Sequence, residues 1–300
     1  MQLMRLFPKP PYDFPRTLAA NRFLFVMSEA RDNRFRRVIH AGDVLALVEV
    51  SSVGTADVPE LNAKVLAANG TVDDALLAVK LHRVLNLDAN LAPFYAVAER
   101  EPVLAQTVRQ LYGLHSMQAD SLFEALLLTM IEQQIALKMA QAAERWLLAW
   151  GGESLTYEGT IYYAFPSAQR IAAATVTDLT PLKITFGRMQ RMIDLAQAIV
   201  SGAFDLENLR DQPADVVYRE LVALKGVGHW TAAWTLVRAQ GQHPFVGASD
   251  VALRAAVNYY YRSLSGRANV ELVEQTFAQY GEFAGIAAFY TIMRWAFDRY

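Results

Sequence analysis

The stretch that decides the fold is LVALKGVGHWTAAWTLVRAQGQHPFVGASD, residues 221–250. Two glycines one residue apart, Gly226 and Gly228, interrupt an apolar helical pattern and supply backbone angles that other residues resist. The pattern predicts two helices joined by a tight turn, a helix-hairpin-helix at residues 213–240. Free backbone N–H groups at the start of the second helix would favour an anion such as a DNA phosphate. The following loop carries Asp250 to the start of another apolar helix.

Composition narrows the class of protein. The chain has 300 residues, 53% hydrophobic and 19% charged, which favours two lobes with well-buried interiors. No apolar run could span a bilayer and residues 1–15 lack a signal-peptide core, so a soluble cytoplasmic protein is expected. The absence of cysteine excludes disulfides, thiolate nucleophiles and cysteine-ligated iron–sulfur clusters. A net charge of −2 does not indicate a broad basic DNA-binding face, but a grip through backbone amides needs fewer cations.

Hydrophobic periodicity divides the chain into two regions. Residues 1–115 are predicted to form a mixed domain of antiparallel sheet and helices, and residues 116–300 a helical region. The proline-rich start, residues 7–18, is expected to be extended. The predicted strands are residues 23–27, 35–39, 44–50 and 61–68. The predicted helices cover about residues 72–87, capped by Thr71, then 103–111, 121–134, 136–150, 186–200 and 283–295. From residue 91 onward only helices are expected, so the fold class is α+β, mainly α.

The sequence L-K-G-V-G-H-W-T-A at residues 224–232, followed by S-D-V-A-L-R at 249–254, resembles the helix-hairpin-helix DNA glycosylases of the 3-methyladenine-DNA glycosylase II (AlkA) type. Residues 10–14, PPYDF, and the helical segment 122–135 are also similar to this family. The resemblance implies two helical lobes with an N-terminal sheet domain like that of the TATA-binding protein. It also implies base-excision repair, in which alkylated purines such as 3-methyladenine and 7-methylguanine are flipped out and released.

Asp250 is the candidate catalytic residue. Breaking the bond between a base and deoxyribose builds positive charge on the sugar, and a carboxylate can stabilise that charge and activate water. An arbitrary aspartate at a helix start is more often only a cap. The resemblance places Asp250 at the family's catalytic position, and a helix N-terminus favours the ionised form that catalysis needs.

Three aromatic residues, Trp230, Trp234 and Phe283, are candidate substrate-binding residues. Trp230 and Trp234 lie four residues apart on one helix and share a face, where they could stack on a cationic flipped base. Core packing is an equal alternative for Trp234 and for Phe283. In family members that also cleave the DNA strand, a lysine occupies the position of Trp230. The tryptophan therefore predicts a monofunctional hydrolase without lyase activity.

The resemblance also supplies candidate DNA contacts. Gln134 matches the family's intercalating position, which fills the gap left by a flipped base. A solvent-facing helix end is the alternative for Gln134. Lys225, where the family usually has proline, is expected to meet phosphate or solvent. The predicted DNA-binding residues are Gln134, Lys225, Gly226, Val227, Gly228, His229 and Thr231.

No cofactor is predicted to be required. The five histidines show no zinc-ligand spacing. The resemblance implies a Na, K or Mg ion on the hairpin carbonyl groups of Val222, Leu224 and Val227. The expected partner is damaged double-stranded DNA, with the protein a monomer that needs no protein partner. Three alternatives stay open: a glycosylase for oxidised or deaminated purines, a non-catalytic binder of distorted DNA, and a metabolic helical enzyme with a structural hairpin.

Overall fold

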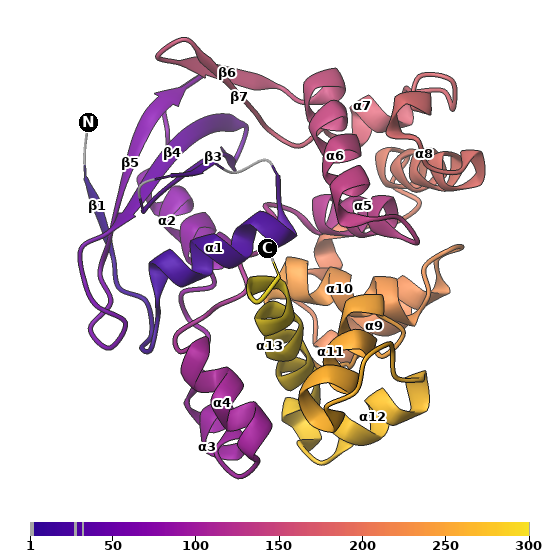
Figure 1. The fold of residues 1–300 in the computed structure, drawn as a ribbon. Helices are drawn as coiled ribbons and strands as arrows, with labels where there is room; N and C mark the ends of the chain where they lie inside the picture. Colours follow the sequence, from indigo (N-terminus) through magenta and orange to yellow (C-terminus); the bar gives the residue numbers. More distant parts are fainter. Residues whose placement is uncertain (1–2, 27–28, 32, 300) are drawn as a thin grey trace.

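The computed structural model describes residues 3–26, 29–31 and 33–299, with only the backbone described at 29–31. The N-terminal region is built on an antiparallel sheet with the strand order β1-β5-β4-β3-β2. Figure 1 shows this sheet on the left and helices α5 to α13 filling the rest of the molecule. The strands are β1 (Met4–Leu6), β2 (Glu29–Arg31), β3 (Arg34–Ala41), β4 (Val44–Ser52) and β5 (Leu61–Ala68). The strands predicted at 35–39, 44–50 and 61–68 are confirmed.

Both faces of the central strand β4 are covered, which explains its nearly continuous apolar sequence. Ala46, Val48 and Val50 face the main hydrophobic core, whereas Leu45 and Leu47 belong to a second, smaller cluster. That cluster is completed by side chains of a β-hairpin from the helical region, β6 (Ser154–Tyr157) and β7 (Thr160–Tyr163). The helical region therefore reaches back onto the outer face of the sheet, as the upper part of Figure 1 shows.

This β-hairpin overturns the expectation of helices only after residue 91. Glu158 and Gly159 both have positive φ, 48° and 78°, and form the two-residue turn between the strands. Such turns twist in the sense that suits paired strands. The sequence did contain the signal, because a Glu-Gly pair separates two runs rich in threonine, tyrosine and isoleucine.

The strand predicted at 23–27 is also wrong, because helix α1 spans Phe14–Leu24. The Asp13 side chain accepts a hydrogen bond from the Arg16 N–H, and Pro15 stands in the first turn. Together they start a helix within the segment expected to be extended. Met27 lies outside the described residues. In helix α2 (Asp74–Val84) the cap is Asp73, not Thr71, since Asp73 accepts the N–H groups of Ala75 and Leu76.

The remaining helices follow the predicted periodicity closely. Ser121 caps α5, and the segment predicted at 186–200 forms α8 with the same bounds. These helices are α3 (Ala92–Ala98), α4 (Pro102–Gln110), α5 (Leu122–Glu132), α6 (Leu137–Gly151), α7 (Ala168–Ala172), α8 (Phe186–Val200), α9 (Ala214–Ala223), α10 (His229–Gln240), α11 (Val251–Arg262), α12 (Val270–Ala278) and α13 (Ala284–Phe297). Short 3-10 turns are η1 (Thr180–Leu182), η2 (Glu207–Leu209) and η3 (Gly281–Phe283). The fold class α+β, mainly α, is confirmed.

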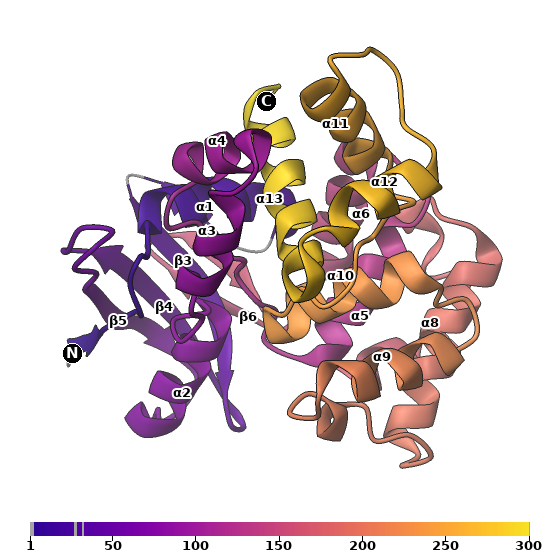
Figure 2. The same ribbon diagram turned by 90° about the horizontal axis from the view of Figure 1, so that it is seen from below.

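Helix α13 lies at the centre of the molecule, between α1 and α4 on one side and α10 to α12 on the other (Figures 1 and 2). One continuous hydrophobic cluster runs from Leu6 in β1 to Met293 in α13. Residues before and after position 115 therefore share one hydrophobic core. The domain boundary between residues 115 and 116 stays a prediction. None of the described helices combines the length and apolar character needed to cross a lipid bilayer.

Candidate nucleic-acid interface and active site

The helical hairpin consists of α9, the turn 224–228 and α10. Gly226 adopts a φ of +87°, which only glycine reaches without strain, and Gly228 precedes the first residue of α10. No side chain caps α10, and the first backbone bond into it runs from the Ala232 N–H to the Gly228 carbonyl. Lys225, Gly226 and Gly228 are exposed. The turn thus presents uncapped N–H groups to solvent in the arrangement that binds phosphate.

Val227 is buried and anchors this turn in the core, so any contact that it makes with DNA must come from its backbone. The side chains of His229 and Thr231, two of the predicted DNA-binding residues, already have partners within the protein. Both ring nitrogens of His229 have protein partners, the Tyr218 hydroxyl and the Val246 carbonyl, each at 2.8 Å. Thr231 is 3% exposed and its hydroxyl accepts a hydrogen bond from Gln133. These two residues can offer a phosphate only their backbone N–H groups.

Gln133 links the loop between α5 and α6 to the hairpin. Its Nε2 donates to the Gly226 carbonyl at 3.0 Å and to the Thr231 hydroxyl at 2.8 Å. The next residue, Gln134, is exposed and has a φ of 56°. The candidate intercalating residue is therefore held at a fixed place beside the phosphate-binding turn. The sequence pattern places Gln133 at the C-terminal end of α5, but it does not reveal the hydrogen bonds from Gln133 to the hairpin.

Asp250 begins α11, and both oxygens of its carboxylate are engaged. Oδ1 accepts the N–H groups of Ala252 at 2.8 Å and Leu253 at 3.0 Å. Oδ2 accepts the indole N–H of Trp230 at 2.9 Å. Three N–H donors thus fix the carboxylate at the N-terminus of α11. The residue is partly exposed, as a group that must meet a substrate has to be.

The loop before Asp250 is fixed from two sides. The His229 ring holds the Val246 carbonyl, and the Asp250 N–H donates to the Gly247 carbonyl at 2.8 Å. On the other side Gly285 in α13 lets the loop pack closely, because a Cβ there would lie 2.1 Å from the His243 carbonyl oxygen. The hairpin and α13 together set the position of the carboxylate.

Trp230 and Trp234 both reach the loop at Gly247. A Cβ on this glycine would lie 3.6 Å from Cδ1 of Trp230 and 3.7 Å from Nε1 of Trp234. Trp234 also packs edge-on against Phe289, with 6.4 Å between ring centroids. The cavity beside Trp234 measures about 20 Å³, which could hold a water molecule but not a purine. Trp234 therefore forms a wall of the core as well as the flank of the Asp250 loop.

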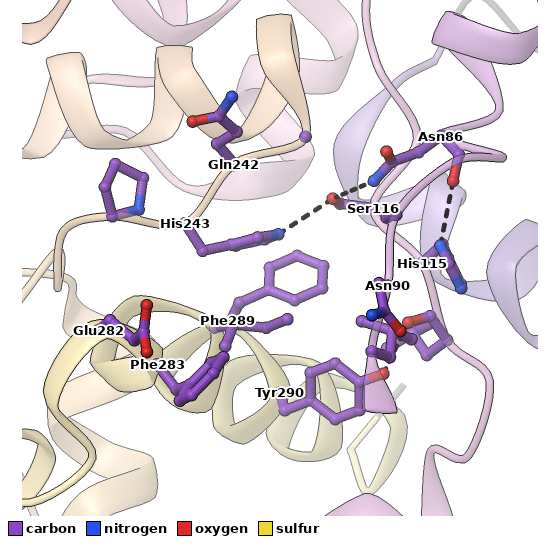
Figure 3. A pocket seen from close by; sticks show the side chains of 16 residues that line it. Asn86, Asn90, His115, Ser116, Gln242, His243, Glu282, Phe283, Phe289 and Tyr290 are labelled. Carbon is purple, nitrogen blue, oxygen red and sulfur yellow. Dashed lines mark hydrogen bonds between the residues drawn. The ribbon is translucent and has the colours of Figure 1, made fainter. Parts of the chain in front are cut away.

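Phe283 is separated from the other predicted substrate contacts. It lines a cavity of about 300 Å³ between the loop 241–244, η3 and α13, and the segments 86–91 and 114–116. Figure 3 shows Phe283, His243, Phe289 and Tyr290 around this space, with Asn86 and Asn90 opposite. Neither Trp230 nor Asp250 lines it. The cavity that Phe283 lines is thus distinct from the surroundings of Trp230 and Asp250, and a role of Phe283 in substrate binding stays a prediction.

The backbone carbonyl groups of the helical hairpin form the predicted cation site. Among the described residues there is no cluster of three acidic, histidine or cysteine side chains, so an ion would have only backbone oxygens as ligands. The Leu224 carbonyl already accepts the Val227 N–H at 3.0 Å, which leaves one lone pair. Carbonyl oxygens at Val222, Leu224 and Val227 suit a hard cation but supply no charge to hold it.

Comparison with known proteins agrees with this geometry. No protein-family model matches the chain. It is 28% identical over 267 residues to a DNA-3-methyladenine glycosylase of Bacillus subtilis, covering 88% of this chain and 87% of that protein. It is 26% identical over 231 residues to a probable bifunctional transcriptional activator/DNA repair enzyme AlkA of Mycobacterium tuberculosis, covering 76% of this chain and 44% of that protein.

Among solved structures, a 3-methyladenine DNA-glycosylase from Archaeoglobus fulgidus superposes with a TM-score of 0.80 at 20% identity. The match covers 99% of this chain and 98% of that one. This likeness establishes the fold that the two chains share. The sequence relatives carry the names DNA-3-methyladenine glycosylase and AlkA. The glycine turn, the uncapped α10 and the carboxylate at the start of α11 are the local features that the fold brings together. These similarities support the helix-hairpin-helix DNA glycosylase superfamily, AlkA type, as the family of this chain.

Proposed function

We propose that this protein is a DNA base-excision repair glycosylase that hydrolyses the N-glycosidic bond of alkylated purines. The observation that carries the proposal is the Asp250 carboxylate, held by the Trp230 indole N–H directly beside the phosphate-binding turn. The relatives named DNA-3-methyladenine glycosylase support the same activity. Hydrolysis would leave an abasic site in the DNA and release the free base.

The chemistry assigned to Asp250 follows from its charge. As the bond from C1′ to the base nitrogen breaks, the sugar becomes electron-poor, and a nearby carboxylate stabilises it. Water then adds to C1′ and gives up its proton, for which Asp250 is the acceptor. A purine alkylated at a ring nitrogen is already cationic, so it leaves as a neutral base and needs no acid to protonate it. One carboxylate is therefore sufficient.

Trp230 and Trp234 would recognise the base. An electron-rich indole attracts a cationic heterocycle, a contact worth about 0.5 to 2 kcal/mol. Because the cavity at Trp234 is too small for a purine, the base would stack against the exposed edge of the aromatic wall rather than enter a deep pocket. A shallow site selects by charge more than by shape, which suits a range of alkylated bases.

We further propose that the enzyme is monofunctional. Strand cleavage of the lyase type needs an amine that attacks C1′. The side chain nearest to the Asp250 carboxylate in the hairpin is an indole, and the indole nitrogen is not a nucleophile. Lys225 lies in the exposed turn, where it can meet a phosphate. The protein is expected to act as a monomer inside the cell on damaged duplex DNA, with Na, K or Mg held by the hairpin carbonyls as an accessory to phosphate binding.

The deciding experiment is base release from DNA treated with a methylating agent, with the products identified by mass. The wild-type protein should release methylated purines, and Asp250→Asn should lower the rate by about 10²- to 10⁴-fold. Asparagine is as good a helix cap as aspartate, so the variant should fold and bind DNA normally. Full activity of Asp250→Asn would remove this residue from the mechanism.

Two controls separate the alternatives. Oxidised and deaminated duplexes, tested in parallel, show whether another lesion is preferred. DNA binding without release of any base would indicate a non-catalytic binder. Abundant borohydride-trapped enzyme–DNA adducts would contradict the monofunctional assignment.

A further inference from the structure

The side chain of Arg191 in α8 lies directly against the phosphate-binding turn. A Cβ at Gly226 would be 2.4 Å from Nε, 2.6 Å from Cδ and 3.0 Å from Cζ of Arg191. On its other side, Nη1 is 3.7 Å from the Cβ position of Gly187 in the first turn of α8. The guanidinium therefore fills a slot between two glycines, and any side chain at Gly226 would close that slot.

The positive charge in this slot has no acidic partner. In the part of the chain that the structure describes, no carboxylate lies within 4.0 Å of Arg191, and its Nε is buried without a hydrogen-bond acceptor. The neighbouring Arg188 is 5% exposed, donates to the Ile131 carbonyl and has a buried Nε that also lacks an acceptor. Burial and the charge of Arg191 both lower the pKa of Arg188.

Arg238 provides the contrast. It is also buried, but its two terminal nitrogens each donate to Glu132 at 2.6 Å. Arg238 is thus compensated by a carboxylate, and the buried Arg210 donates to the carbonyl groups of Ala119 and Asp120. Two neighbouring arginines without a carboxylate make an uncompensated positive site, which is costly unless an anion completes it.

Two helices begin beside this site without a side-chain cap. Thr185 before α8 and Gly228 before α10 make no side-chain cap hydrogen bond, and no atom lies within 4 Å of the Cβ position of Gly228. The contact of Arg191 with Gly226 brings α8 to the turn that precedes α10. Backbone N–H groups and a guanidinium that lie at the same turn are complementary to the oxygens of a phosphodiester.

We propose that Arg191 binds the DNA backbone phosphate at the turn 224–228, adding a charged side-chain contact to the grip of the hairpin amides. The inference rests on the proposed function, since it concerns the same DNA. It also adds a positive charge at the hairpin of a chain whose net charge is −2, where the polyanion would be bound.

The test compares Arg191→Met, which removes the charge but keeps the length, with Arg191→Lys, which keeps a charge. Arg109→Met is the matched control, since Arg109 is exposed on α4, far from α8 in both Figures 1 and 2. Affinity for a short undamaged duplex is measured over a series of salt concentrations. Arg191→Met should reduce the slope of log K against log salt by about 0.9 and weaken binding roughly tenfold at low salt. Arg191→Lys and Arg109→Met should keep the wild-type slope.

Base release gives an independent reading. Arg191→Met should raise KM for methylated DNA and leave kcat unchanged, because a phosphate contact acts on binding and not on the bond that breaks. An unchanged salt slope in Arg191→Met, or an equal loss of affinity in Arg191→Met and Arg191→Lys with a lower Tm in both, would show a packing role and overturn the inference. Failure of the wild-type protein to bind DNA at all would instead defeat the proposed function itself.

Discussion

The indole of Trp230 both contacts Asp250 and places an aromatic face beside it, an arrangement that the sequence alone does not reveal. Its N–H donates to Oδ2 at 2.9 Å, while Oδ1 is left to the backbone of α11. The hydrogen bond fixes the rotation of the carboxylate, and the ring beside it supplies an aromatic surface for the base. Under the proposed function, Trp230 would position Asp250 in addition to stacking on the base.

The variant Trp230→Phe separates these two functions. Phenylalanine keeps an aromatic face but cannot donate to Asp250, so kcat should fall about tenfold, as expected for one hydrogen bond to a charged group. The KM for methylated DNA should change little. Trp234→Phe is the control, because Trp234 makes no hydrogen bond to Asp250. A wild-type kcat in Trp230→Phe would show that the hydrogen bond does not orient the carboxylate.

His243 makes stability depend on pH. Burial, together with the charge of nearby His115, lowers the pKa of His243 to about 3. Its Nε2 contacts the Ser116 hydroxyl at 3.1 Å, and its Nδ1 is buried without a partner. The ring is thus neutral in the folded protein but takes up a proton near pH 6.5 when the chain unfolds. The unfolding free energy should therefore fall as the pH drops from 6.5 towards 3.

The comparison of wild type with His243→Gln measures this contribution. Urea unfolding at several pH values between 7.5 and 5 should show the wild type losing stability relative to the variant, by at most about 1.4 kcal/mol per pH unit. Other titrating groups, such as His40, whose pKa is raised by its hydrogen bond to Asp120, remain in both proteins and cancel. Parallel pH profiles for the two proteins would contradict the prediction.

At the scale of elements, the loop between α5 and α6 combines a link to the hairpin with an unfavourable backbone conformation. Gln133 ties it to the hairpin through Gly226 and Thr231. Gln134, next to it, holds the left-handed conformation, which is unfavourable by about 1–2 kcal/mol for a residue with a Cβ. A glycine at this position would relieve the strain.

Two substitutions at this position separate strain from side-chain function. Gln134→Gly should raise the unfolding free energy by up to about 1 kcal/mol, because the strain disappears. Gln134→Ala keeps the strain and should leave stability nearly unchanged, since the side chain is exposed. Both should lower kcat/KM for base release on duplex DNA if Gln134 fills the gap left by the flipped base. Wild-type base release by both variants would exclude Gln134 as the intercalating residue.

At the scale of the whole molecule, a buried ion pair joins the sheet to the helical region. Arg37 in β3 and Glu124 in α5 are each 1% exposed and lie 2.5 Å apart. Arg37 also donates to the Gln118 carbonyl at 3.1 Å, in the connection between the two regions. Burial raises the pKa of Glu124, and the charge of Arg37 opposes that rise. The relative position of the sheet and the hairpin lobe thus depends on this pair as well as on the shared apolar core.

The variant Arg37→Met should lower the unfolding free energy by about 3–5 kcal/mol, because it leaves the Glu124 carboxylate buried without a cation. The double variant Arg37→Met/Glu124→Gln removes the unpaired charge and should recover part of the loss. Arg83→Met is the control at an exposed pair, where the change should stay within about 0.5 kcal/mol. Equal destabilisation by Arg37→Met and Arg83→Met in urea unfolding would show that the buried pair has no special role.

Local sequence patterns predicted most of the helices and strands. They missed α1 and the β6–β7 hairpin, which depend on short stretches of sequence. The 3.6-residue periodicity predicted α8 with its observed bounds, and apolar alternation predicted β3, β4 and β5. Helix α1 was missed because the run of apolar and aromatic residues that starts at Phe23 has strand propensity, whereas the cap at Asp13 starts a helix that ends at Leu24. The β-hairpin β6–β7 was missed because four-residue strands are too short for periodicity to detect.

The sequence by itself determined the glycine turn, the carboxylate that follows it and the tryptophan in place of a lysine, because backbone conformation and residue chemistry are local properties. Only the tertiary structure decided which side chains are free to act. His229 and Thr231 are engaged by Tyr218 and Gln133, Phe283 lies in a separate cavity, and Arg191 lies at the phosphate-binding turn. These outcomes depend on contacts between segments far apart in the chain, which no local pattern encodes.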